Sequence, residues 1–196
     1  MLATLALAAC AGAVEDCADY GEAQAMGQVE GELDEASGLA VSHQQENLVW
    51  AHNDKGDSAR FFAIGLNASA RGTFLLTDVD AVDFEDMAAG PDGSLWIADT
   101  GDNTNGRPSV SLLQVEEPED PDSSAAVSPT VYELTYEDHA VDSEAMVVDE
   151  DGTPWLIDKV EGGTARLYRA DLKSGLLVEE LAFRVPGDGL TAVTGA

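Results

Sequence analysis

The feature that most constrains the fold of this chain is an internal repeat marked by its three tryptophans. Each copy begins with an acidic residue, which is followed by a first short apolar run and then by a second one. The second run contains the tryptophan, which is Trp50, Trp96 or Trp155. The acidic residues that begin the three copies are Glu35, Glu85 and Glu144. Glu and Trp are 15 residues apart in the first copy and 11 in the other two, and we place the extra four in the polar turn 42–47, where insertions cost little.

Two further runs of strand length complete each copy. The third runs are 60–64, 110–115 and 165–170, and the fourth runs are 73–76, 131–136 and 178–185. The runs are rich in β-branched and aromatic residues and are separated by Gly, Asp, Asn and Pro, which is typical of short β-strands between turns. Four strands in roughly 40–50 residues is the pattern of a β-propeller blade. The alternative is an unrelated β-sandwich whose copies agree by chance.

We therefore predict an all-β fold, a β-propeller of four-stranded antiparallel blades. About three blades are present, at 33–80, 81–138 and 139–187, and 188–196 begins a fourth. Propellers typically need four to eight blades to close, so we expect the chain to be a truncated part of a six-bladed ring. The assembly of two half-rings is the alternative, and a complete ring is expected to be a monomer.

The N-terminal segment is typical of an exported protein. Residues 1–10 are apolar and end in Leu-Ala-Ala-Cys10, which resembles the lipobox of bacterial lipoproteins, where the cysteine is acylated. A disulfide between Cys10 and Cys17 is the alternative. Residues 11–32 are acidic and rich in Gly and Ala, and we interpret them as a flexible tether. The expected location is the cell envelope or the extracellular space, with lipid anchoring as the only contact with the membrane.

The charge balance restricts the partners. The chain has 38 Asp and Glu against 9 Lys and Arg, a formal charge of −29. Such a field repels phosphate backbones, which argues against nucleic acid and anionic membrane surfaces as partners. It favours divalent cations with carboxylate ligands, and we expect a small molecule or a protein as the ligand.

Acidic residues lie at two kinds of position that a propeller brings to one rim of its tunnel: the starts of first strands and the loops after second strands. These candidates for a metal site are Glu35, Asp83, Glu85, Asp142 and Glu144, together with Asp54, Asp57, Asp99, Asp102 and Asn103. Ca²⁺ takes six to eight oxygen ligands and would relieve the repulsion among these carboxylates. The alternatives are that the loop residues only cap turns and that the first-strand acids hold backbone N–H groups of the neighbouring blade.

Catalytic candidates are few. His52 follows a second strand and is a candidate acid or base, and Glu85 is a candidate to activate water. The chain has no Gly-x-Ser-x-Gly nucleophile motif. We expect the three tryptophans to pack between blades rather than to form a sugar-binding platform.

The Glu-x-Ser-Gly-Leu-Ala start, the Asn-Asp-x-Gly-Asp loop at 53–57, Phe-Glu-Asp-Met-Ala at 84–88 and Gly-Asp-Asn at 101–103 resemble a known group. They are similar to uncharacterised bacterial secreted or lipid-anchored β-propellers with WD40- or NHL-like repeats, over residues 33–196. More remotely, the blade starts resemble the SMP-30/gluconolactonase superfamily of calcium-dependent propellers, which implies metal ligands at Glu35, Glu85 and Glu144. Activity does not transfer, because that superfamily's later ligands would lie in blades absent here.

We therefore predict an exported cell-envelope propeller that binds a ligand or partner at a Ca²⁺-binding tunnel mouth. A metal-dependent hydrolase of lactones or phosphoesters is one alternative, in which the cation polarises the substrate oxygen. A non-catalytic scaffold is the other.

Overall fold

The computed structural model describes residues 24–160 and 163–185. Cys10, Cys17 and the segment 188–196 lie outside the described residues. Within those ranges the chain forms thirteen β-strands and no helix, so none of the described residues belongs to a helix that could cross a membrane. The strands are β1 (Ala36–Val41), β2 (Leu48–Asn53), β3 (Arg60–Gly65), β4 (Ala70–Leu76), β5 (Phe84–Ala89), β6 (Ser94–Asp99), β7 (Val110–Glu116), β8 (Ala125–Val127), β9 (Thr130–Tyr136), β10 (Ser143–Val148), β11 (Pro154–Asp158), β12 (Gly163–Asp171) and β13 (Leu176–Val185).

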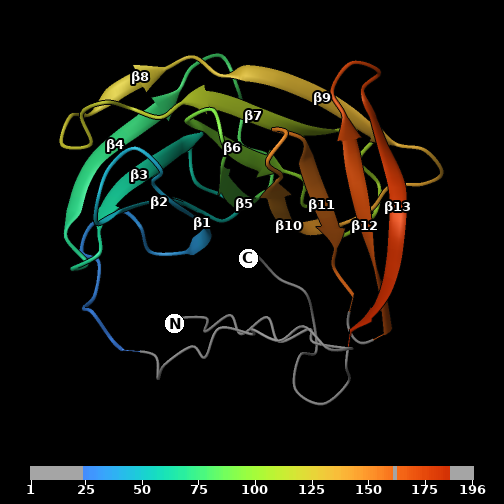
Figure 1. Ribbon diagram of the computed structural model, residues 1–196, viewed down its shortest axis with the longest axis horizontal. Helices are drawn as coiled ribbons and strands as arrows, with labels where there is room; N and C mark the ends of the chain where they lie inside the picture. The colour runs from blue at the N-terminus through green and yellow to red at the C-terminus, as the bar shows by residue number, and fades with distance from the viewer. Residues whose placement is uncertain (1–23, 161–162, 186–196) are drawn as a thin grey trace.

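The strands assemble into three four-stranded antiparallel units. The first is β1-β2-β3-β4, the second β5-β6-β7-β9 and the third β10-β11-β12-β13, and we call them blades 1, 2 and 3. Figure 1 shows them side by side in an arch, with β1, β5 and β10 on the inner side and β4, β9 and β13 on the outer side. The predicted all-β propeller fold is confirmed, because each repeat forms one blade.

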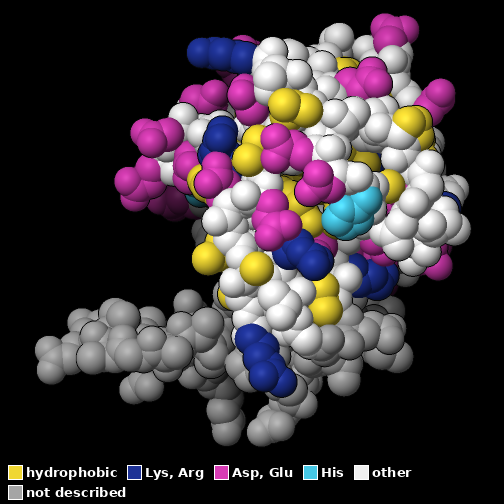
Figure 2. Space-filling model, turned by 90° about the vertical axis from the view of Figure 1, so that its right-hand side faces the viewer, with side chains coloured by type: hydrophobic (Ala, Val, Ile, Leu, Met, Phe, Trp, Pro, Cys, Tyr) yellow, Lys and Arg dark blue, Asp and Glu magenta, His cyan; other side chains and the backbone are white. Residues whose placement is uncertain are grey.

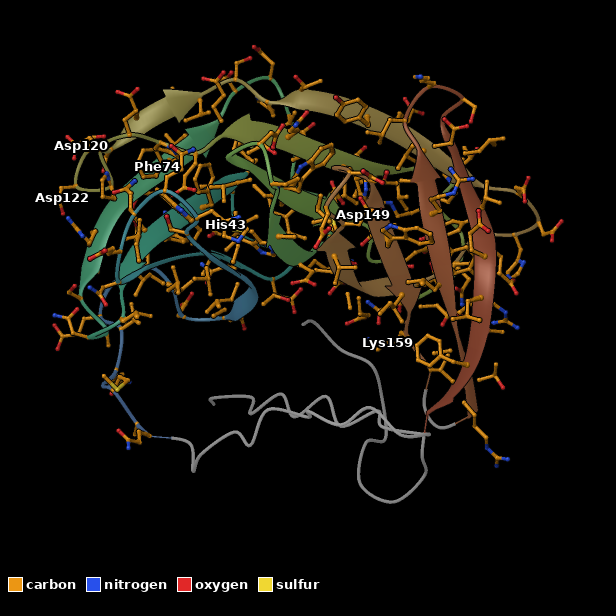
Figure 3. All side chains as sticks on the ribbon, in the orientation of Figure 1. His43, Phe74, Asp120, Asp122, Asp149 and Lys159 are labelled. Atoms are coloured by element: carbon orange, nitrogen blue, oxygen red, sulfur yellow. The ribbon has the colours of Figure 1, made fainter. Side chains whose placement is uncertain are left out.

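Parallel strand pairs join the blades at the outer rim, which the sequence analysis did not anticipate. The loop after β7 leads to β8, which pairs with β4 of blade 1, and β13 of blade 3 pairs with β9 of blade 2. Asp122, which is labelled at the left edge of Figure 3, forms an ion pair with Arg71 of β4 and so fastens that loop to the strand. These pairs cover strand edges that would otherwise be open.

Two clusters of buried apolar side chains hold the three blades together. One cluster joins blade 1 to blade 2 around Trp50, Phe61 and Phe74, and another joins blade 2 to blade 3 around Trp96 and Leu156. Side chains alternate between the faces of a strand, and we call the face that carries the tryptophan of a blade its front face and the other its back face. Blade 2 contributes its back face to the first cluster and its front face to the second, whereas blade 1 contributes only its front face and blade 3 only its back face. Trp50 and Trp96 therefore pack between blades as predicted, whereas Trp155 on the front face of blade 3 is half-buried.

The strand register corrects the alignment of the first repeat. Trp50, Trp96 and Trp155 face Ala40, Ala88 and Val147, which confirms that the tryptophans are equivalent. Ala36, Phe84 and Ser143 in turn face Asn53, Asp99 and Asp158. Glu35 is therefore equivalent to Asp83 and Asp142, and Ser37 to Glu85 and Glu144.

The alignment of Glu35 with Glu85 and Glu144 was thus wrong by two residues. The β1–β2 turn is longer by two residues, not four, because ten residues separate Ala40 from Trp50 and eight separate Ala88 from Trp96. A bulge at the start of each inner strand adds one residue that faces no partner, and because all three copies carry it, the offset comes only from aligning Glu35 with Glu85 instead of with Asp83.

Candidate metal centre

Four carboxylates lie at the starts of β5 and β10, on the inner side of the arch. Asp83, Glu85, Asp142 and Glu144 are between 1% and 8% exposed. Together with Asp54, they form two groups of three acids, and within each group one oxygen per residue lies within 4.8 Å of the others. The first group is Asp54, Asp83 and Glu85, and the second is Glu85, Asp142 and Glu144. Glu85 belongs to both groups, so the site spans all three blades.

The bulge in each inner strand gives this arrangement its local cause. Glu85 and Glu144 are the extra residues between Phe84 and Asp86 and between Ser143 and Ala145. A bulge turns its side chain out of the regular alternation. Asp83 and Asp142 lie two residues before the bulged glutamates, and in each blade the aspartate and the glutamate therefore project to the same end of the blade.

The carboxylates perturb one another. Burial, followed by the charges of Glu144 and Asp83, raises the pKa of Glu85 to about 9. Burial also raises the pKa of Glu144, although its contact with Lys159 acts in the opposite direction. A carboxyl group that stays protonated at neutral pH in a cluster of acids marks a place where a cation would be favoured.

Two lysines serve as counterions. Lys55 Nζ lies 2.6 Å from Asp83 Oδ2, and Lys159 Nζ contacts Glu144 and lies 3.9 Å from Asp142 Oδ2. Figure 3 places Lys159 at the lower end of β11, on the inner side of the arch. Neither lysine forms an ion pair with Glu85 in the described part of the chain. The sequence showed both lysines in the loops after second strands, but we did not include them in the predicted site.

Gly101 allows the two groups to come together. A Cβ atom at this position would lie 2.0 Å from Glu85 Oε1 and 2.6 Å from Asp83 Cγ. The next amide, of Asp102, donates a 2.6 Å hydrogen bond to Asp142 Oδ1. The Gly101-Asp102 loop thus contacts carboxylates of blade 2 and of blade 3. Position 101 must be glycine because the Glu85 side chain lies too close to leave room for a Cβ atom.

The remaining predicted ligands lie outside the two groups. Glu35 and Asn103 are exposed. Asp57 and Asp99 bind Arg60 and Arg107, and Asp102 accepts hydrogen bonds from the Arg107 amide and the Thr104 hydroxyl. The contacts of Asp57, Asp99 and Asp102 therefore agree with the alternative in which these acids only stabilise the loops after second strands.

His52 lies inside the molecule rather than on the rim. Its side chain is fully buried, with its ring 5.5 Å from that of Phe84, and burial lowers the pKa of the imidazole. The neutral ring packs between blades 1 and 2. This placement differs from the expected one because His52 is the last front-face residue of β2 before Asn53 reaches the rim.

Asp86 is a buried acid that the sequence analysis overlooked. Its carboxylate accepts hydrogen bonds from the amides of Met87 at 2.8 Å and Met146 at 2.7 Å. Met146 lies on β10, so Asp86 holds a backbone N–H of the neighbouring blade. We had considered this role for the first-strand acids, and Asp142 also fills it through the Asp102 amide.

A cavity of about 180 Å³ lies between blades 2 and 3. Its walls include Asp102, Arg107, Tyr136, His139 and Val141. Val141 directly precedes Asp142, and Asp102 donates its amide to Asp142. Asp142 thus adjoins two wall residues of the cavity, although Glu85, Asp142 and Glu144 themselves are not among the residues that line it.

Comparisons with known proteins give similarity of structure only. No family model and no curated protein matches the chain. Virginiamycin B lyase from Staphylococcus aureus is similar with a TM-score of 0.45 and 15% identity, over 80% of this chain and 43% of that one. The catalytically inactive variant of that lyase with quinupristin has a TM-score of 0.44 and 15% identity, over 77% and 41%. The chain spans less than half of the length of these proteins, and no activity is carried over.

Proposed function

We propose that this protein binds a divalent cation, Ca²⁺, at the inner-strand carboxylates and through it an oxygen-bearing ligand, either a small molecule or a partner protein. The observation that supports it is the position of Glu85, a buried carboxyl group shared by two groups of three acids. A cation would replace the proton that Glu85 otherwise retains and remove the repulsion among the acids.

The donor set favours Ca²⁺. Both groups contain carboxylate oxygens and no nitrogen or sulfur donor among the described residues, which suits a hard cation with six to eight oxygen ligands. Three acids leave coordination positions for water and for oxygens of a ligand. The cavity beside Asp142 offers a place for the rest of such a ligand.

The lysines would have to give way. The side chain of Lys55 is 60% exposed, so it can move into solvent when a cation approaches Asp83. Lys159 is 30% exposed and contacts both acids of blade 3. The cation would thus take over the role that the two ammonium groups have in its absence.

A non-catalytic scaffold is the second candidate. The hydrogen bonds from the Asp102 amide to Asp142 and from the Met146 amide to Asp86 favour it, because both acids join blades without any ligand. The hydrolase alternative, in which a rim carboxylate activates water, stays a prediction, and both catalytic candidates, His52 and Glu85, are buried.

Calcium should raise the melting temperature of the full chain. A ligand at 100 times its Kd adds about 2.7 kcal/mol to the free energy of unfolding, which is about 5–10 °C for a chain of this size. Glu144→Gln removes an oxygen charge from the second group and should reduce the shift to less than half. Thermal unfolding with excess CaCl₂ and with chelator measures both.

Glu46→Gln is the matched control, because Glu46 is an exposed glutamate of the β1–β2 turn. It should keep the full calcium shift. Equal melting temperatures with CaCl₂ and chelator, together with no heat of Ca²⁺ binding by calorimetry, would refute the binding function and leave the scaffold.

We also propose that the protein is attached to the cell envelope through an acylated Cys10. The proposal rests on the Leu-Ala-Ala-Cys sequence that ends at Cys10. Expressed in a bacterium, the full chain should incorporate labelled palmitate, and Cys10→Ser should abolish the label while Cys17→Ser keeps it. Incorporation that survives Cys10→Ser would contradict the anchor.

A further inference from the structure

The cavity between blades 2 and 3 contains an arginine with unused hydrogen-bond donors. Arg107 lines this cavity, and its side chain is only 17% exposed. Its Nη1 donates hydrogen bonds to Asp99 Oδ1 at 2.8 Å and to the carbonyl oxygen of Gly101 at 2.9 Å. Within residues 24–160 and 163–185, Nε and Nη2 of Arg107 make no hydrogen bond. The guanidinium group is therefore held in place through one nitrogen and keeps its other donors free.

The two free nitrogens form the edge of the guanidinium group that binds carboxylates elsewhere in this protein. Arg71 uses the same two nitrogens to hold both carboxylate oxygens of Asp122. Nε of Arg169 likewise donates to Glu180. The N–H groups of this edge are parallel and match the spacing of two carboxylate oxygens, so a carboxylate there accepts two hydrogen bonds. In Arg107 the same edge has no carboxylate partner among the described residues.

The free edge of Arg107 is accessible. In the part of the chain that the structure describes, the buried side-chain polar atoms without a hydrogen-bond partner belong to His52, Glu117 and Tyr168. Nε and Nη2 of Arg107 are not among these buried atoms, so both reach open space. The carboxylate of Asp102, on the same cavity wall, accepts a 2.7 Å hydrogen bond from the backbone amide of Arg107 instead. The guanidinium edge is thus available to a ligand.

Apolar side chains form another part of the cavity wall. They include Val110, Val141 and the ring of Tyr136. The hydroxyl group of Tyr136 donates a 2.7 Å hydrogen bond to Ser143 Oγ, which fixes the position of the ring. At the junction of blades 1 and 2, the outer strand ends at Leu76 instead of a tyrosine, and the linker to the next inner strand is one residue longer. The tyrosine wall and the shorter linker therefore belong to the junction of blades 2 and 3.

We propose that this cavity binds a small carboxylic acid. Its carboxylate accepts hydrogen bonds from Nε and Nη2 of Arg107, and its apolar part lies against Val110, Tyr136 and Val141. At about 180 Å³ the cavity is smaller than the sites of drug-sized molecules, which limits the ligand to a single ring or a short branched chain. The inference rests on the proposed function in that it names the chemical class of the ligand, but the contact with Arg107 requires no cation.

Acidic residues near the cavity should limit the affinity for an anion. Asp138 lines the cavity, and Asp142 directly follows the wall residue Val141. Figure 2 shows acidic side chains over much of the side that contains β12 and β13, with lysine and arginine side chains between them. A calcium ion at Asp142 would remove part of this repulsion. We therefore expect the carboxylic acid to bind weakly in chelator and more tightly with calcium.

Benzoate is the probe for this site, and benzamide, which has a similar shape but no charge, is its control. Each is titrated into the isotope-labelled full chain, and the backbone amide signals of Val110 and Val141 are followed by NMR. In chelator, benzoate should shift these signals with a Kd of about 1 mM, a value typical of so small a ligand. Benzamide should bind at least about tenfold more weakly, because it lacks the second carboxylate oxygen and the charge. Excess CaCl₂ should lower the Kd of benzoate several-fold.

Arg107→Lys keeps the positive charge but loses the forked edge, so it should weaken benzoate binding at least about tenfold. Arg169→Lys is the matched control, because Arg169 is an exposed residue that pairs with Glu180 outside the cavity, and it should keep the Kd of the parent. Ala140→Phe is a second variant for the case that Arg107→Lys does not fold. It fills the cavity from the linker and keeps the arginine, so it should abolish benzoate binding. Circular dichroism shows which variants keep their strands.

Three results would each overturn the proposal. They are benzoate that shifts no cavity amide at about 20 mM with or without calcium, benzamide that binds as tightly as benzoate, and a folded Arg107→Lys variant with the affinity of the parent. Equal benzoate affinity in CaCl₂ and in chelator would leave the cavity site standing and count against the cation at Asp142. The ligand site and the cation site can therefore fail separately.

Discussion

Trp50→Ala should lower the free energy of unfolding by about 3–5 kcal/mol, the usual cost of removing a large buried aromatic side chain. Trp50 is fully buried and makes edge contacts with Phe61 and Phe74 at centroid distances of 5.6 and 5.5 Å. Such a loss corresponds to a melting temperature lower by about 10 °C or more. Thermal unfolding followed by circular dichroism measures it.

The indole of Trp50 also has a polar role. Its Nε1 donates a 3.1 Å hydrogen bond to Glu117 Oε1, a carboxylate that is only 4% exposed and also accepts from Ser42. Trp50→Phe keeps most of the apolar volume but removes this donor, so it should cost about 1–3 kcal/mol. The two variants separate packing from hydrogen bonding.

Val131→Ala is the control for this series, because Val131 is 46% exposed and its truncation should change stability by less than about 0.5 kcal/mol. A Trp50→Ala variant as stable as this control would show that the cluster between blades 1 and 2 does not hold the chain together.

Without divalent cations, the protein should lose stability as the pH rises from about 5 to 9. An ordinary glutamate releases its proton near pH 4.5, whereas folded Glu85 keeps it until about 9. Between these values the unfolded chain binds fewer protons than the folded one, so the stabilisation that is complete below pH 4.5 is lost as the pH rises. The melting temperature in chelator should fall by several degrees across this window.

Glu85→Gln should reduce this dependence and be more stable than the parent at pH 8–9, because the amide cannot ionise. Some slope should remain, since the pKa of Glu144 is also raised. Saturating calcium should likewise flatten the profile of the parent chain, because the bound cation favours the ionised acids. A parent profile that rises toward pH 9, or an unchanged slope in Glu85→Gln, would refute the buried, protonated Glu85.

The blade pattern and the rim position of the acids followed from local features of the sequence. Trp50, Trp96 and Trp155 occupy one register position, and the runs around them form the strands of three blades. This was predictable because strand periodicity and turn residues are local properties of the chain. Asp83, Glu85, Asp142 and Glu144 were predicted at one rim because their position follows from strand order.

Which of the acids meet depends on how the blades pack together. The strand register places Ala36 at the position of Phe84, so Glu35 is in line with Asp83 rather than with Glu85, and the front-face position of His52 buries it. The pairing of Lys55 with Asp83 and of Asp86 with the Met146 amide links residues 28 and 60 positions apart. Contacts between neighbouring blades depend on how whole sheets pack, and no local pattern in the sequence encodes that geometry.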